Sequence, residues 1–266
     1  MKYGFIGTGN MGGTLARVLC KQVDPQQVML ANRTSIKAEK LAQELGCTFG
    51  TNEELARTCD TIFLGVKPQM MADMLGDLRE VLTAREEKPL LVSMAAGLTM
   101  DAIDKMAGGG FPVVRIMPNT ACTVGEGMIL YCHNEVATLR QVNTVLEALD
   151  RSGVLDELPE NLMDAGSAVA GCGGAYVCLF LEALADGGVA CGLPRHKARL
   201  YAAQMLKGNA MLSMIGGEHT GAMKDAICSP GGTTIAGVRA LEKGGFRSAV
   251  MEAVIAAYEK TLELKK

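Results

Sequence analysis

The glycines at positions 7, 9 and 12 form the pattern G-x-G-x-x-G near the start of the chain. A short apolar run from Tyr3 to Ile6 precedes them, and an apolar, helix-competent run from Leu15 to Leu19 follows. In this context the pattern predicts a turn from a strand into a helix whose first N–H groups and dipole face the pyrophosphate of a dinucleotide. The alternative is an ordinary glycine-rich turn. The residues that would contact the dinucleotide are Gly7, Thr8, Gly9, Asn10, Met11 and Gly12.

The second strand that we expect, Val28 to Ala31, ends at Asn32 and Arg33. An Asp or Glu at this place usually accepts a hydrogen bond from the ribose 2′-hydroxyl of NAD(H). This chain has an amide and a guanidinium there instead, and a guanidinium can pair with a 2′-phosphate. We therefore expect NADP(H) to be preferred, with NAD(H) as an alternative cofactor. The alternative for Arg33 is a solvated charge at the start of a helix.

Three further expected strands end in small or turn-forming residues: Thr61–Val66, Leu90–Ser93 and Val113–Met117. Ligands of parallel sheets bind beyond the carboxyl ends of the strands, so these ends should line a cofactor cleft. Pro68 should hold Lys67 extended, although a lone lysine is more often a surface charge. The residues that we assign to the cleft are Val66, Lys67, Pro68, Ala95 and Ala96.

The pattern of apolar runs changes after Asp156. Before it, strand-like and helix-like runs alternate, which predicts a parallel sheet wrapped by helices, an α/β fold. After it no convincing strand occurs, and the chain reads as all helical. We place a dinucleotide-binding domain at residues 1–157 and a helical domain at residues 158–266. The remaining expected elements are strands at Lys2–Ile6 and Met128–Cys132, a helix at Ser35–Leu45 closed by Gly46, a helix opened by Pro194, and a last helix from about Ser248, its N-cap, to Leu264.

The composition excludes several classes of protein. Of the 266 residues, 48% are hydrophobic and 21% are charged, as in globular proteins. A net charge of −3 without clustered Lys and Arg predicts neither nucleic acid nor an acidic membrane as partner. No signal peptide is visible, and we expect no apolar segment to approach the about 20 residues of a membrane span. Nine cysteines without a C-x-x-C motif predict free thiols in a reducing compartment, hence a cytoplasmic protein.

The helical half is rich in Gly, Ala and Met, with few charges inside its helices. Helices that are apolar on more than one face must be covered by other protein. We therefore expect at least a homodimer; the alternative is a compact monomeric bundle.

The segment Lys224–Val238, KDAICSPGGTTIAGV, closely resembles the signature of the pyrroline-5-carboxylate reductase family. The resemblance extends in order over essentially the whole chain, and includes Glu182–Val189, Gly192–Pro194 and the motifs VKP, SMAAG and RIMPNT. It implies a Rossmann-type domain followed by an all-α dimerisation domain that also binds substrate, in a homodimer often assembled into a larger ring such as a decamer. It also implies reduction of 1-pyrroline-5-carboxylate to L-proline with NAD(P)H, the last step of proline biosynthesis.

Within that signature, residues 229–234 give a Pro-Gly-Gly turn that opens a helix. Free N–H groups at a helix start suit a carboxylate for the same reason that they suit a phosphate. We assign the substrate carboxylate to the backbone of Gly231, Gly232 and Thr233. The resemblance implies that Thr234 or Ser229 hydrogen-bonds the imine or amine nitrogen; a proton relayed by water is an equal alternative, because a threonine hydroxyl is a poor acid.

Three further residues have two readings each. The resemblance implies that Glu160 contacts the substrate and that Asn52 lies near the adenosine. The alternatives are a solvated charge at a helix start for Glu160 and a helix N-cap for Asn52. Tyr176 would close the pocket or, as is more frequent for a tyrosine, pack in a core.

The chain departs from the family pattern at Gly174 and Thr220, where a proline is usual. Two alternative functions remain open besides the one that the resemblance implies. One is a related NADP-dependent reductase of another cyclic imine. The other is a non-catalytic NADP-binding regulator, which only these departures support.

Overall fold

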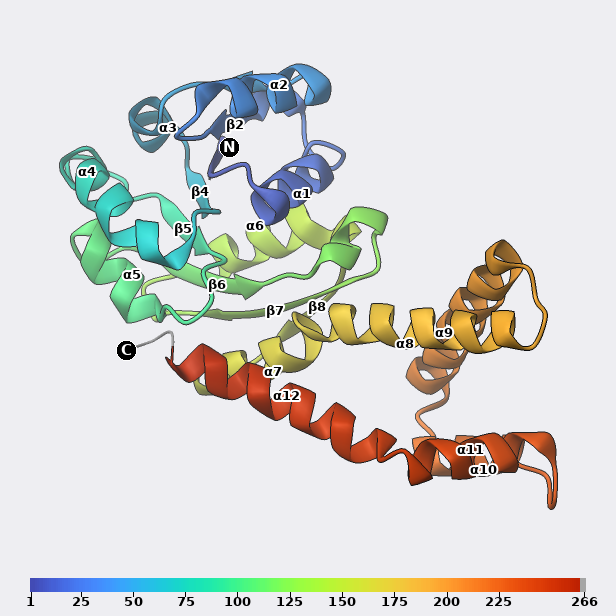
Figure 1. Ribbon diagram of the computed structural model, residues 1–266. Coiled ribbons are helices and arrows are strands. Elements are labelled where there is room, and N and C mark those ends of the chain that lie inside the picture. Colours follow the sequence, from blue (N-terminus) through green and yellow to red (C-terminus); the bar gives the residue numbers. More distant parts are fainter. Residues whose placement is uncertain (264–266) are drawn as a thin grey trace. The chain divides into compact units, whose positions relative to one another are not determined.

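The computed structural model describes residues 1–263, which divide into two units (Figure 1). The first unit comprises Met1–Cys172 together with residues 257–263, and the second comprises Gly173–Ala256. The first unit therefore extends past residue 157, because helix α7 (Met163–Ala170) packs on the sheet and buries Met163 in its core.

An eight-stranded sheet in the order β3-β2-β1-β4-β5-β6-β7-β8 forms the centre of the first unit. This order from β3 to β6 is that of a Rossmann-type sheet. The strands β1, β4 and β5 are buried along their whole length, as their continuous apolar sequences predict. The strand bounds are β1 Tyr3–Ile6, β2 Val28–Ala31, β3 Thr48–Phe49, β4 Thr61–Leu64, β5 Leu90–Ser93, β6 Val113–Met117, β7 Gly127–His133 and β8 Gly153–Glu157.

The parallel sheet is confirmed, apart from one pair. Strand β7 runs antiparallel to β6, since the connection over residues 118–126 is too short for a crossover helix. Strands β3 and β8 were not expected from the sequence; β3 has two residues, and β8 is mostly exposed. The expected third strand ends at Leu64 rather than Val66, because Gly65 already begins the turn.

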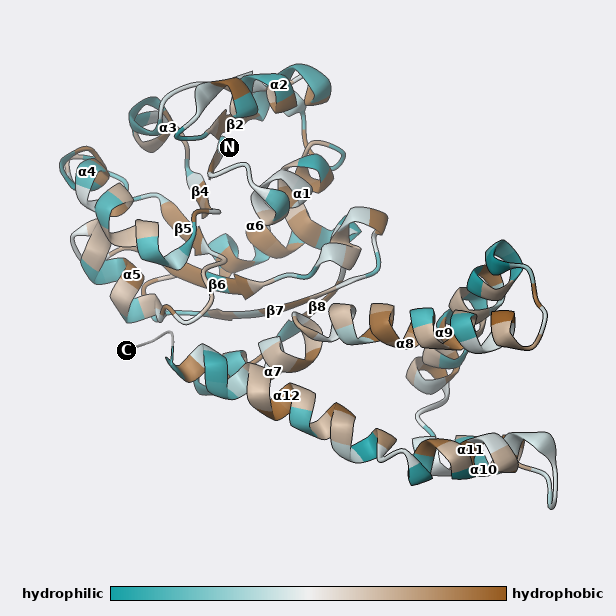
Figure 2. Ribbon diagram, viewed as in Figure 1, coloured by the Kyte–Doolittle hydropathy of each residue, from teal (hydrophilic) through white to brown (hydrophobic). Residues whose placement is uncertain are grey.

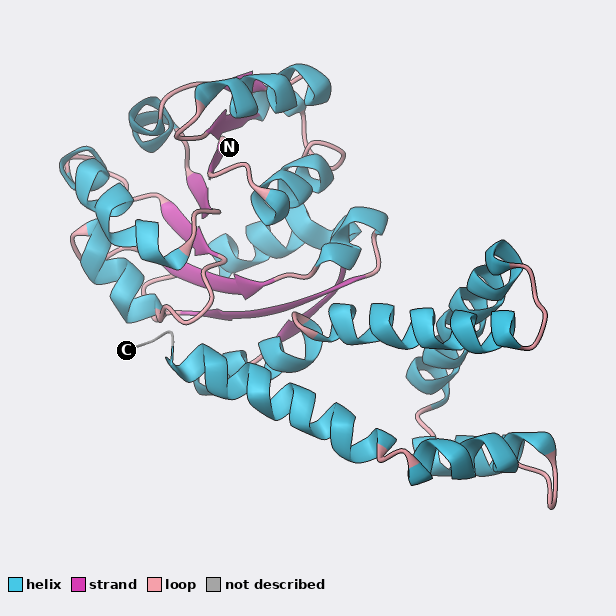
Figure 3. Ribbon diagram, viewed as in Figure 1, coloured by secondary structure: helices cyan, strands magenta, loops and turns pink. Residues whose placement is uncertain are grey.

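Helices cover both faces of this sheet (Figure 3). Residues of α3, α4, α5 and α7 belong to one hydrophobic cluster, and residues of α1, α2 and α6 to another. The predicted helix at Ser35–Leu45 is confirmed with its cap, since Gly46 has φ of +69°. The helices are α1 Asn10–Leu19, α2 Ser35–Leu45, α3 Asn52–Thr58, α4 Met71–Thr83, α5 Met100–Ala107 and α6 Leu139–Leu149; the 3-10 segments are η1 Pro25–Gln27, η2 Pro68–Met70, η3 Thr120–Val124, η4 Asp150–Ser152 and η5 Glu160–Leu162.

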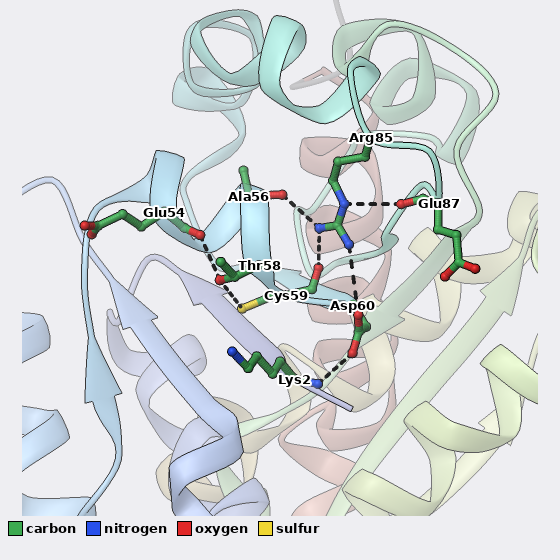
Figure 4. Close-up of polar contacts among 8 residues, drawn as sticks. All are labelled: Lys2, Glu54, Ala56, Thr58, Cys59, Asp60, Arg85 and Glu87. Carbon is green, nitrogen blue, oxygen red and sulfur yellow. Dashed lines mark hydrogen bonds and ion pairs between the residues drawn. The ribbon is translucent and has the colours of Figure 1, made fainter.

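The side chain of Arg85 fastens the end of α3 to the start of the sheet (Figure 4). Its Nη1 donates to the carbonyls of Ala56 at 2.9 Å and Cys59 at 2.6 Å, and its Nη2 lies 4.0 Å from Asp60. Asp60 in turn accepts a hydrogen bond from the backbone N–H of Lys2 at 2.8 Å. A guanidinium thus satisfies carbonyls that the end of a helix leaves without partners.

The second unit consists of helices, and no strand occurs after Glu157 within the part of the chain that the structure describes. Two helix starts differ from expectation. Pro194 is the N-cap of α9 rather than its first residue, and the last helix begins at Phe246, so Ser248 lies inside it. The expected end at Leu264 falls outside the described residues. The helices are α8 Gly173–Ala190, α9 Arg195–Gly216, α10 Thr220–Ile227, α11 Thr233–Lys243 and α12 Phe246–Glu263.

The second unit buries little of its own apolar surface. Its buried hydrophobic residues among those described are Ala185, Ala198 and Ala202, whereas side chains such as Leu179 and Leu200 are 69% and 60% exposed. Figure 2 shows apolar residues along α8, α9 and α12. Such helices must be covered by something outside this single chain.

The helical run Glu160–Ala190, which includes α7 and α8, is long and apolar enough to cross a membrane by length and composition alone. Its most apolar window has a mean hydropathy of 1.7 and is 11% buried. The expectation that no segment reaches that length is wrong for this run, because few charged residues interrupt its apolar residues. Composition alone does not separate a membrane span from a helix that another protein surface covers.

Candidate active site

The loop from β1 to α1 leaves no room for a Cβ atom at Gly7 or Gly12. Gly7 has φ of +97°, and a Cβ there would lie 2.7 Å from the carbonyl carbon of Gly65; a Cβ on Gly12 would collide with the carbonyl oxygen of Gly7. Glycines are therefore required where the loop meets α1 and β4. Gly9 is the N-cap of α1 and a Cβ there would meet open space. No side chain caps this end, so the first N–H groups of α1 are available to a phosphate.

A cavity of about 510 Å³ lies between this loop, α1 and α2. Its residues include Arg17, Lys37 and Lys40, three cations within one concave surface. The acid of the cavity, Glu44, forms an ion pair with Arg17, which holds the pKa of the Glu44 carboxyl below its usual range. The lining residues are Thr8, Gly9, Asn10, Gly13, Thr14, Arg17, Asn32, Lys37, Lys40, Leu41 and Glu44.

Two polar side chains connect the loop to the end of β2. The amide oxygen of Asn32 accepts from the backbone N–H of Thr8 at 3.4 Å, and its Nδ2 donates to the carbonyl of Thr34 at 3.2 Å. The Thr8 hydroxyl is buried without a protein partner. Arg33 is exposed and stands outside the cavity lining. A buried hydroxyl in need of a partner, uncapped N–H groups and three cations together fit a phosphorylated dinucleotide.

The sequence interpretation missed Arg17, Lys37 and Lys40. Their signal was present: Lys37, Lys40 and Leu41 are three and four residues apart and so lie near one face of α2. That this face turns toward the glycine loop depends on how α2 packs, which no local pattern gives.

The remaining expected cofactor residues follow strands β4 and β5. Strand β4 pairs in parallel with β1, and β5 pairs in parallel with β4, so their carboxyl ends share the edge that carries the glycine loop. Lys67 is extended, as predicted, with φ −63° and ψ 146°, and Pro68 begins η2. Ala95 is buried, and Ala96 is half-buried. The structure thus places these small residues and Lys67 at one edge of the sheet.

The Pro-Gly-Gly turn opens a helix in the second unit, as predicted. Gly231 has φ of +67°, Gly232 is the N-cap of α11, and no side chain caps this end. One expectation needs correction: the N–H of Gly232 donates to the carbonyl of Ser229 at 3.0 Å and is committed to the turn. The N–H groups in the first turn of α11, from Thr233 on, have no carbonyl within that helix to bind.

Thr234 borders a cavity of about 280 Å³ within the second unit. The other lining residues are Asn209, Ser213, Thr220, Met223, Lys224 and Ile227. The Ser229 hydroxyl lies beside Gly232, so closely that a Cβ there would collide with it. Both hydroxyls that the sequence singles out thus belong to the start of α11.

Comparison with known proteins gives a consistent result. Residues 160–264 match the family described as pyrroline-5-carboxylate reductase dimerisation, and residues 2–97 match NADP oxidoreductase coenzyme F420-dependent. A pyrroline-5-carboxylate reductase of Synechocystis sp. is 40% identical over 100% of this chain and 99% of that protein. The Escherichia coli reductase is 37% identical over 100% and 98%. A Plasmodium falciparum pyrroline carboxylate reductase structure with NADP bound has a TM-score of 0.90 at 33% identity, covering 100% of this chain and 98% of that one.

This chain belongs to the pyrroline-5-carboxylate reductase family.

Membership in the reductase family confirms the fold class, an oxidoreductase activity and the use of NADP(H). It also explains the exposed apolar helices, because the matched dimerisation region begins at Glu160 and covers all of the second unit. The chain oligomerises, as expected, and the apolar run Glu160–Ala190 lies inside this dimerisation region.

Glu160 is not the solvated charge that the alternative describes. Its Oε1 accepts from the backbone N–H of Met100 at 2.7 Å, at the start of α5, and lies 3.8 Å from Nη1 of Arg115. It also borders a cavity of about 480 Å³ in the first unit, with Cys132, His133 and Glu157 among its neighbours.

Asn52 is not an N-cap either. The N-cap of α3 is Thr51, whose hydroxyl accepts from the N–H of Glu54 at 3.1 Å while the Glu54 carboxylate accepts from the N–H of Thr51 at 2.7 Å. This capping box leaves the half-buried Asn52 as the first residue of α3, with its side chain available for another role.

The departures from the family pattern fall at helix starts. Gly174 is the second residue of α8, and Thr220 is the first residue of α10, which His219 caps through Nδ1. A helix start accepts proline but does not need it, so both helices form without it. Tyr176 is half-buried, and its hydroxyl donates to the carbonyl of Ala253 at 3.0 Å and ties α8 to α12.

Proposed function

We propose that this chain reduces 1-pyrroline-5-carboxylate to L-proline with NADPH, the last step of proline biosynthesis. The observation that carries the proposal is that one chain combines an unobstructed phosphate-binding helix start at α1 with an uncapped helix start at α11, inside a sequence that is 40% identical to a named reductase along its length. The first suits a dinucleotide and the second a carboxylate.

The cofactor would lie along the carboxyl edge of the sheet. Residues 7–12 hold the pyrophosphate by their N–H groups, and Asn32 and Arg33 hold the adenine ribose and its 2′-phosphate. Lys37 supplies a second cation from the cavity, which supports NADP(H) over NAD(H). Asn52 approaches the adenosine. Val66, Lys67, Pro68, Ala95 and Ala96 border the nicotinamide, where small residues let the ring lie against backbone.

When bound, the dinucleotide would supply a hydride to the imine carbon. The chain's own residues bind and orient the two ligands and exclude water from the site. The N–H groups of Gly231 and Thr233 hold the substrate carboxylate, while Gly232 keeps the turn closed through Ser229. Binding at a helix start fixes the carboxylate and therefore the face of the imine ring that meets the hydride.

Thr234 and Ser229 are the candidate catalytic hydroxyls. The imine carbon accepts a hydride readily only when its nitrogen is protonated or hydrogen-bonded, so a hydroxyl at this nitrogen assists the reaction. A threonine hydroxyl is a weak acid, so a proton relayed by water is an equal source. We keep Glu160 as a candidate contact for the substrate nitrogen, because its carboxylate borders a cavity even though one oxygen is committed to Met100.

Residues 1–157 would bind the dinucleotide, and residues 158–266 would bind the substrate and form the dimer. We propose a homodimer that assembles further into a ring such as a decamer, in the cytoplasm, with neither nucleic acid nor membrane as partner. All nine cysteines are free thiols, which supports a reducing compartment.

A panel of cyclic imines tests this function against its nearest rival. Five-membered and six-membered imines, each with and without the carboxylate, are offered with NADPH, and the products are identified by mass spectrometry. We expect the five-membered imine with its carboxylate to be reduced fastest and to give proline. A preference for another imine would assign the chain to a related reductase. Tight NADPH binding without reduction of any imine would favour the regulator.

A further inference from the structure

The loop over residues 94–99 joins β5 to α5 and contains the two alanines that we place against the nicotinamide. The hydrogen bonds at its β5 end are long. The N–H of Met94 donates to the carbonyl of Leu64 at 3.4 Å. The N–H of Ala95 donates to the hydroxyl of Ser93, also at 3.4 Å. Ordinary N–H···O bonds are about 2.7–3.2 Å long, so the position of the loop depends strongly on what holds its other end, the start of α5.

Two side chains hold the start of α5. Thr99 is its N-cap, and the Thr99 hydroxyl accepts from the N–H of Ala102 at 3.2 Å. The N–H of Met100, the first helical residue, has no carbonyl within the helix to bind, and Oε1 of Glu160 accepts it at 2.7 Å. The carboxylate also lies at the positive end of the α5 dipole. Glu160 thus caps a helix that begins 60 residues before it in the chain.

Buried partners hold both ends of this hydrogen bond. Nη1 of Arg115, whose side chain is fully buried, lies 3.8 Å from Oε1 of Glu160. Asp164 accepts from Nη2 of the same guanidinium at 2.7 Å and so fixes its position. The side chain of Met100 is buried in the core, where the Cys132 thiol donates to its sulfur at 3.9 Å. Strand β6, the guanidinium, the carboxylate and the start of α5 are therefore connected in one line within the first unit.

We propose that Glu160 is a positioning residue for the reduction. Through the N–H of Met100 it fixes residues 94–99, and these residues in turn fix the distance between the nicotinamide and the imine carbon. This inference rests on the proposed function and on the nicotinamide lying against Ala95 and Ala96. Hydride transfer needs a narrow range of distance and angle, so a displacement of about 1 Å can slow it about a hundredfold. The role requires a hydrogen-bond acceptor at Oε1 and no negative charge, unlike a contact with the substrate nitrogen.

The kinetic test compares Glu160→Ala with Glu160→Gln in the full-length enzyme. Alanine removes the acceptor and should lower kcat about tenfold or more, while the KM values for NADPH and for the imine change less than about threefold. Glutamine keeps an oxygen that can accept from Met100 and should retain at least about half of the parent kcat. The control is Glu157→Ala, which removes an exposed carboxylate at the border of the same cavity and should leave kcat unchanged.

Hydrogen–deuterium exchange reports the hydrogen bond without any imine. In peptides that cover residues 94–103, Glu160→Ala should speed exchange about tenfold or more, while peptides from α1 exchange as in the parent enzyme. Glu160→Gln and Glu157→Ala should leave exchange at residues 94–103 close to that of the parent.

Unchanged exchange at residues 94–103 in Glu160→Ala would overturn the hold of Glu160 on the loop. Faster exchange with an unaltered kcat would overturn its effect on the reduction. A glutamine variant as slow as the alanine variant, with a raised KM for the imine, would replace the positioning role by a charge contact with the substrate. Because exchange is measured on the enzyme alone, it tests the loop even if the parent enzyme fails to reduce the proposed imine.

Discussion

The guanidinium of Arg115 in β6 donates from Nη2 to Oδ1 of Asp164 in α7 at 2.7 Å, and both side chains are buried. Glu160 stands 3.8 Å from Nη1 of the same guanidinium and binds the first N–H of α5. Asn119, just beyond β6, donates to the carbonyl of Ala170 at 3.0 Å. These contacts fasten η5 and α7 to the sheet immediately before the helical unit begins.

Loss of the buried guanidinium should therefore weaken the first unit. We expect Arg115→Met to lower the free energy of unfolding by about 3–5 kcal/mol, since it removes the cation from a buried carboxylate. Urea unfolding measures the change. The double variant Arg115→Met with Asp164→Leu should recover part of the loss, whereas a single variant as stable as the parent would show that the ion pair contributes nothing.

Arg33 should select the cofactor. We expect Arg33→Asp to raise the KM for NADPH about tenfold or more and the KM for NADH far less, because only NADPH carries the 2′-phosphate. Lys37→Glu should act in the same direction from inside the cavity. The control is Lys105→Glu, on the exposed face of α5. Equal losses with both cofactors would remove Arg33 from the phosphate site.

Thr234 should act in turnover rather than in cofactor binding. We expect Thr234→Ala to lower kcat by about tenfold or more while the KM for NADPH changes little, because the hydroxyl assists only at the reacting nitrogen. Thr234→Ser keeps the hydroxyl and should retain most of the activity. An unaltered kcat in the alanine variant would refute the role and favour a proton relayed by water.

The apolar helices should hold the oligomer together. Leu179 in α8 and Leu139 in α6 are 69% and 72% exposed in the single chain, but only Leu179 lies in the dimerisation region. We expect Leu179→Asp to shift the protein toward monomer in light scattering. Leu139→Asp should leave the assembly unchanged. Equal effects of both substitutions would place the interface elsewhere.

Local patterns were sufficient for much of the fold. The strands Val28–Ala31, Leu90–Ser93 and Val113–Met117 and the helix Ser35–Leu45 have the bounds that the sequence predicts, because buried strands and capped helices carry their own signals. Strands β3 and β8 were not predicted from the sequence, since β3 is two residues long and β8 is exposed along most of its length. The reversed direction of β7 depends on a short connection, not on its own residues.

The candidate site was predictable only where it is built from contiguous residues. The glycine loop and the turn at residues 229–234 could be read directly, because their geometry needs those residue types in order. The pairing of Arg115 with Asp164 joins residues 49 apart, and the cations on α1 and α2 meet only through packing. A charged residue inside the apolar strand VVRIM was the one local sign that a buried acid must lie opposite.

The most direct measurement is the oxidation of NADPH, followed by absorbance, with and without 1-pyrroline-5-carboxylate and repeated with NADH. We expect rapid oxidation that depends on the imine, yields proline and is faster with NADPH than with NADH at equal, limiting concentrations. NADPH that binds tightly but is not oxidised when the imine is added would contradict it.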